Sequence, residues 1–70
     1  MVRDIKAELE VELAALEEKR IKLGKFMKTD AYDALPYTQV VLLGNQFGFM
    51  TNYAGCLSAR IKDLQESSNE

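Results

Sequence analysis

A chain of 70 residues makes at most one small domain, because so short a chain buries little apolar surface when it folds. One cysteine and no histidine exclude an intramolecular disulfide and leave a zinc site without its usual ligands. The net charge of -2 selects no class of partner, and no signal peptide opens the chain. We therefore expect a cytoplasmic protein, without metal or cofactor, that gains stability by forming a homo-oligomer.

The first predicted element is a long helix over about residues 2–28, since this segment lacks proline and is rich in Glu, Lys, Leu and Ala. Its apolar residues recur at helical spacing and form one stripe: Val2, Ile5, Leu9, Leu13, Leu16, Leu23 and Met27. Arg20 lies in the same stripe, where a charge needs a partner or water. Two interpretations stay open: a guanidinium that extends to water and fixes the register, or a cation that faces a ligand.

A turn over residues 29–35 follows, in which Thr29 or Asp30 is able to cap a short turn of chain. Pro36 suits the first turn of a second helix, which we expect over about residues 36–65, with a frayed tail at 67–70. Because the connection is short, the two helices should be antiparallel neighbours. The predicted fold is all-α: one helical-hairpin domain over residues 1–66 that assembles into a homo-oligomeric helical bundle.

Facing residues of an antiparallel hairpin have a constant index sum, and a sum of 66 aligns the two apolar stripes. It pairs Val2 with Leu64, Ile5 with Ile61, Leu9 with Leu57, Leu16 with Met50 and Leu23 with Leu43. The same register places Arg20 opposite Gln46, so a polar pair is expected among the apolar layers.

The predicted second helix also carries a second face, because residues 34–59 contain no charged side chain. Small residues recur there at helical spacing and form what we call the small-residue row: Val41, Gly44, Gly48, Asn52, Gly55 and Ala59. Glycine in a helix costs about 1 kcal/mol against alanine, so something should approach these positions closely. We predict that this row, with Phe49, is the oligomer interface. The alternatives are a bilayer, which buried amides disfavour, and a complex with a host protein.

The segments "LEEKRIKLGKF", "AYDAL" and "LLGNQFGFMTNYAGCLSARI" together resemble the small helical-hairpin proteins of tailed phages and prophages, including the crAss-like phages. The resemblance covers roughly residues 9–64 and falls on Leu16, Leu23, Phe26, Tyr32, Leu35, Leu43, Gln46, Met50, Tyr53, Leu57, Arg60 and Ile61. It implies a phage accessory protein and assigns no catalytic residue.

An enzyme is not expected, since the sequence lacks histidine, a metal-ligand cluster and a phosphate loop. Asp30 and Asp33 lie in the turn, where capping explains them. Cys56 is interpreted as a small core hydrophobe. The basic run Lys19–Lys28 is too short, and the first helix too acidic, to favour DNA or RNA as a partner.

Two binding hypotheses from different classes remain. The first is a sponge that sequesters a small anionic nucleotide immune signal, because cations suit phosphates, amides suit base edges and aromatic rings suit stacking. The residues of these types are Lys19, Arg20, Lys22, Asn45, Gln46, Asn52, Tyr53 and Arg60. The second is an inhibitor or assembly module that docks a helix face on a host protein, with Tyr32, Tyr37, Phe49 and Tyr53 as anchors. For the amides and aromatics, plain interhelical packing remains the alternative.

Overall fold

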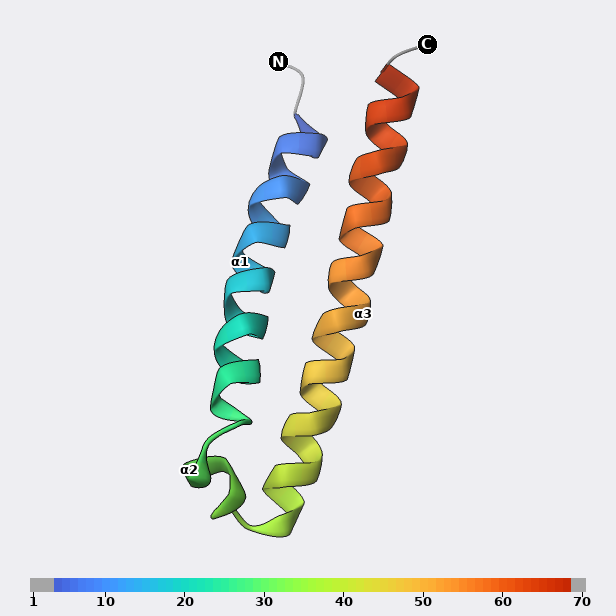
Figure 1. Ribbon diagram of the computed structural model, residues 1–70. Helices are drawn as coiled ribbons and strands as arrows, with labels where there is room; N and C mark the ends of the chain where they lie inside the picture. Colours follow the sequence, from blue (N-terminus) through green and yellow to red (C-terminus); the bar gives the residue numbers. More distant parts are fainter. Residues whose placement is uncertain (1–3, 69–70) are drawn as a thin grey trace.

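The computed structural model describes residues 4–68, which form three helices and no strand. Figure 1 shows the two long helices, α1 (Ile5–Phe26) and α3 (Tyr37–Ser68), side by side and antiparallel, with the short α2 (Asp30–Asp33) at the closed end. The rod measures 52 × 17 × 17 Å. The all-helical hairpin is confirmed, although the connection predicted as a turn contains a helix of its own.

α1 begins after Asp4, whose carboxylate accepts a hydrogen bond from the Ala7 N–H at 3.0 Å. This cap satisfies one of the N–H groups that the first helical turn leaves without an intrahelical acceptor. The predicted start of the helix near residue 2 lies outside the described residues, and so does Val2, the first residue of the predicted apolar stripe. At the other end the Thr29 hydroxyl donates to the Phe26 carbonyl at 2.6 Å, and the helix stops there.

The closed end is held together by side chains of α2. Thr29 caps α2 by accepting from the Tyr32 N–H at 3.3 Å. The Tyr32 ring meets the Phe26 ring edge to face at 6.0 Å, and its hydroxyl donates to the Val40 carbonyl at 3.0 Å. Tyr32 therefore ties the end of α1 to the start of α3, and Pro36 precedes that start as the sequence indicates.

α3 has 32 residues against 22 in α1, and it extends to Ser68, into the predicted tail. Residues 69–70 of that tail lie outside the described part of the chain. None of the helices that the structure describes is both long enough and apolar enough to cross a bilayer.

The core between α1 and α3 is thin. Within residues 4–68 the buried apolar side chains are Leu9, Ala54 and Leu57, and Leu57 alone is completely enclosed. The other apolar residues that the predicted register pairs, within residues 4–68, are partly covered, except for Ile5, which is 48% exposed at the open end. Two contacts across the hairpin, Glu12 with Tyr53 and Arg20 with Phe47, have index sums of 65 and 67 and lie on either side of the predicted 66.

One predicted layer is wrong. Arg20 does not meet Gln46: its guanidinium lies over the ring of Phe47, and Gln46 is exposed. Neighbouring positions of a helix are turned by about 100°, so a shift of one residue moves the partner to another side of α3. Cys56, expected in the core, is also exposed, because it lies on the side of α3 away from α1.

Candidate functional site

Two hollows open on opposite edges of the seam between α1 and α3. Arg20 meets Phe47 on one edge, and Glu12 meets Tyr53 on the other. Phe47 and Tyr53 are six positions apart on α3, which turns their side chains about 120° from one another. The two hollows are therefore separate sites, and each is described by itself.

The first, the basic hollow, has a volume of about 490 Å³. It lies toward the closed end of the hairpin and combines cationic, apolar and aromatic side chains. Its lining residues are Arg20, Ile21, Gly24, Lys25, Met27, Lys28 and Phe47. Phe47 is the single contribution of α3 to this lining, so the ring forms the wall opposite the cations.

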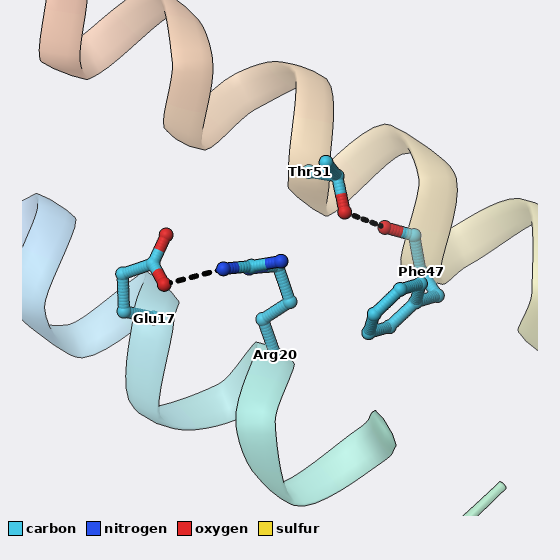
Figure 2. Close-up of polar contacts among 4 residues, drawn as sticks. All are labelled: Glu17, Arg20, Phe47 and Thr51. Carbon is cyan, nitrogen blue, oxygen red and sulfur yellow. Dashed lines mark hydrogen bonds and ion pairs between the residues drawn. The ribbon is translucent and has the colours of Figure 1, made fainter.

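Arg20 is held in this hollow by contacts on two sides (Figure 2). Its Nη2 donates to a Glu17 carboxylate oxygen at 2.6 Å, and its guanidinium carbon lies 5.9 Å from the centroid of the Phe47 ring, within the range of a cation–π contact. The buried Nε–H has no acceptor among residues 4–68. A buried donor without a partner is costly, so the position of the Arg20 side chain is determined by its contacts with Glu17 and Phe47.

Gly24 lets Phe47 come close to α1. A Cβ built on Gly24 would lie 3.3 Å from a ring carbon of Phe47, closer than most real contacts. On the α3 side, the Thr51 hydroxyl donates to the Phe47 carbonyl at 3.0 Å, as Figure 2 shows. The absent side chain at Gly24 thus sets the position of the ring that the guanidinium faces.

The cations around Arg20 differ from those that the sequence analysis selected. Lys25 and Lys28 line the hollow, whereas Lys22 pairs with Glu18 at 3.1 Å and Lys19 is exposed outside the lining. A step of two residues turns a helix by about 200°, so Lys22 is directed away from Arg20. Eight positions turn a helix to within about 80° of the start, so helical angle would have favoured Lys28, whereas Lys25, about 140° from Arg20, has no such signal in the sequence.

The second hollow, which we call the amide groove, has a volume of about 560 Å³. All its lining residues belong to α3: Leu42, Asn45, Gln46, Phe49, Met50 and Tyr53. At its rim the Tyr53 hydroxyl donates a hydrogen bond to the carboxylate of Glu12 on α1. Three predicted ligand residues, Asn45, Gln46 and Tyr53, do lie together here, but apart from Arg20.

The remaining predicted ligand residues lie elsewhere. Arg60 lines two smaller hollows with Ile5 at the open end of the hairpin, far along α3 from Phe47. Asn52 is exposed and lines neither the basic hollow nor the amide groove. The predicted residues are therefore divided among the basic hollow, the amide groove and the open end, and Lys19, Lys22 and Asn52 line none of the hollows described.

The small-residue row faces away from α1. Apart from its own chain neighbours and helix backbone, a Cβ added at Gly44, Gly48 or Gly55 would meet no atom of residues 4–68 within 4 Å. Within the row Val41 is 40% exposed, and beside it Phe49 is 71% exposed. Nothing within the hairpin therefore explains why three positions of α3 are glycine.

The described residues hold no group of three or more side chains of the kinds that ligate metals. What the two hollows offer is recognition: cations and an unpaired N–H beside an aromatic ring in one, and amides beside aromatic rings in the other.

Three comparisons with known proteins show to which family the chain belongs. No curated protein and no solved structure shows a significant match to the chain. The family model described as Sequestin matches residues 3–63, which include all of α1 and α2 and most of α3. Because this match spans far more than half of the sequence, the chain belongs to the Sequestin family.

Proposed function

We propose that this protein is a non-enzymatic sponge of phage type, which acts in the host cytoplasm as a homo-oligomer and sequesters a small anionic nucleotide immune signal. The name of its family denotes sequestration, which is a binding role. The nucleotide, the immune context and the oligomer are our extension of that name. They are supported by the chemistry of the two hollows and by the phage-type resemblance of the sequence.

The observation that carries the proposal is the basic hollow itself, in which Arg20, Lys25 and Lys28 lie around the ring of Phe47. A phosphate would be attracted by the positive charges of these three side chains. The Phe47 ring provides a flat surface on the other side. Phosphate recognition beside an aromatic face is the chemistry that a nucleotide requires.

The amide groove is a second candidate contact surface for a nucleotide, separate from the basic hollow. Asn45 and Gln46 each carry amide donors and acceptors of the kind that pair with base edges, and Tyr53 offers a ring for stacking. We propose these three residues as ligand contacts, together with Arg20. Lys19 and Lys22 lie outside the lining of the basic hollow and are not part of the proposed site.

The test begins with protein purified from a host extract, denatured, and analysed by mass spectrometry of the supernatant. We expect release of a phosphorylated nucleotide, and an increase in melting temperature when that compound is added back. Arg20→Gln should lose most of the increase, and Lys22→Gln, which removes an equal charge directed away from the hollow, should keep it. No release, together with a melting temperature that a panel of cyclic and linear nucleotides leaves unchanged, would overturn the proposal.

One observation favours a second candidate, docking on a host protein. Tyr37 is 82% exposed at the first residue of α3, and exposed aromatic side chains are common anchors of protein interfaces. A host protein captured by the wild-type chain and lost with Tyr37→Ala would favour this candidate. Capture that is unaffected by Tyr37→Ala would count against it.

A further inference from the structure

The surface of α3 that α1 leaves uncovered contains no charged side chain from Tyr37 to Ala59. It consists of the small-residue row and, next to it, the amide groove. In the groove Phe49 is 71% exposed, Leu42 53% and Tyr53 48%. Since residues 34–59 contain no Asp, Glu, Lys or Arg, an identical surface would meet this one without repulsion between like charges.

The surface area indicates how much of the chain is uncovered. The chain exposes 5523 Å², whereas a compact monomer of its 7.9 kDa mass exposes about 4,400 Å². The excess of roughly 1,100 Å² exceeds the ~800 Å² that each partner buries in a standard protein interface. A second hairpin on the outward side of α3 would therefore bring the exposed area close to the value for compact proteins.

The same side of α3 carries both the projections and the recesses that contact between identical copies requires. A two-fold contact uses one surface on both copies, so that surface must be complementary to itself. Phe49 projects directly beside Gly48, and the space above Gly44, Gly48 and Gly55 is open. The hairpin already packs a phenylalanine on a helical glycine, where Phe47 covers Gly24.

We propose that a second copy of this chain docks on the outward side of α3 through the same side, with Phe49 of each copy packed on the small-residue row of the other. All six lining residues of the amide groove belong to one helix, so the groove has only one wall in a single chain. The second copy supplies the opposite wall. That last step rests on the proposed function, whereas the docking does not.

Docking is tested without any ligand, by light scattering at micromolar concentration and by sedimentation. The wild-type chain should have at least twice its 7.9 kDa mass. Phe49→Glu should raise the dissociation constant by roughly 30-fold or more, the loss expected at an interface hot spot. Val11→Glu is the matched control, because Val11 is also 71% exposed but lies on α1. It should change the constant by less than about threefold.

A monomeric wild-type chain overturns the docking proposal, and so does a Phe49→Glu variant that keeps its mass. Loss of mass in Val11→Glu alone would move the interface to α1 and overturn it as well. Far-UV circular dichroism verifies that each variant keeps its helices. If Phe49→Glu loses them, Phe49→Ala replaces it, with an expected rise in the constant of about tenfold.

The proposal that a second copy forms the opposite wall of the amide groove is tested with Gly48→Leu. This substitution changes the interface but no lining residue of either hollow. This variant should be monomeric and should lose the melting-temperature response to the nucleotide released from the wild-type protein. A monomer that keeps the full response would overturn the shared wall. An oligomer that docks as proposed but binds no nucleotide would instead overturn the proposed function and leave the docking intact.

Discussion

The two sides of α3 carry similar apolar side chains but differ in how much of their surface is exposed. Toward α1, Ala54 and Leu57 are buried, and Leu57 has no exposed surface. Away from α1, Leu42 and Phe49 are more than half exposed, and three glycines meet nothing within 4 Å. Leu57 and Leu42 are the same residue type on one helix, so the difference lies in what covers them. The contact with α1 therefore covers only part of the apolar surface of α3.

The largest expected effect comes from shortening one leucine on each side of α3 and comparing the free energies of unfolding. Leu57→Ala should lower the free energy of unfolding by about 2–5 kcal/mol, since it removes enclosed methyl groups and leaves a cavity. Leu42→Ala should change it by less than about 0.5 kcal/mol in protein diluted until it is monomeric. Urea unfolding followed by circular dichroism measures both, and equal losses would contradict the contrast.

A second test compares glycine positions on the two long helices. Gly24→Leu should destabilise the hairpin by about 1–3 kcal/mol, because the new side chain meets the Phe47 ring and must displace it. Gly48→Leu enters open space in the single chain and should leave the unfolding free energy of the dilute monomer within about 0.5 kcal/mol, or raise it. A loss at Gly48 as large as that at Gly24 would mean that α3 is covered within one chain.

A smaller effect should change sign with protein concentration. Gly48→Ala in dilute protein should add about 0.5–1 kcal/mol of stability, since alanine favours a helix and the new methyl group meets no atom of the chain. At concentrations where copies associate, the same methyl group occupies part of the recess for Phe49, and the gain should shrink or reverse. Unfolding curves at two concentrations decide this, and an identical gain at both would contradict an interface at Gly48.

The smallest effect concerns the rim of the amide groove. Tyr53→Phe removes the hydrogen bond to Glu12, in which both residues are exposed, so we expect a loss of roughly 0.5 kcal/mol. Tyr37→Phe is the control, since Tyr37 is 82% exposed. Thermal unfolding at low and high salt measures the pair, and equal changes in both variants would assign no role to the Glu12 contact.

Much of the fold could be predicted, because helical periodicity and one proline are strong local signals. The apolar stripe of the first helix and the position of Pro36 identify the hairpin, and the contacts of Glu12 and Arg20 lie on either side of the predicted register. The short helix α2 was missed. Its four residues depend on the Thr29 cap and on contacts of Tyr32 with both long helices, which a local pattern does not contain.

The candidate site was less predictable, since it depends on the rotation of side chains around a helix axis. Lys22 is closer to Arg20 in sequence than Lys25 or Lys28 is, yet it pairs with Glu18 outside the basic hollow. Gln46 belongs to the apolar stripe by spacing, but lies at its edge and faces the amide groove. Phe47 was not selected as a site residue at all, because only the contact with Gly24 reveals which way its ring is held.

The open end of the hairpin, where α1 begins and α3 ends side by side, makes this protein suitable for tandem fusion. Two copies joined in one polypeptide, with about ten residues between their helices, are linked by at most roughly 36 Å of chain. That reach is shorter than the 52 Å length of the rod. For two hairpins packed side by side, such a fusion permits the arrangement in which both point the same way and forbids the one in which they point in opposite directions, so the length of a connecting segment would report the polarity of the assembly.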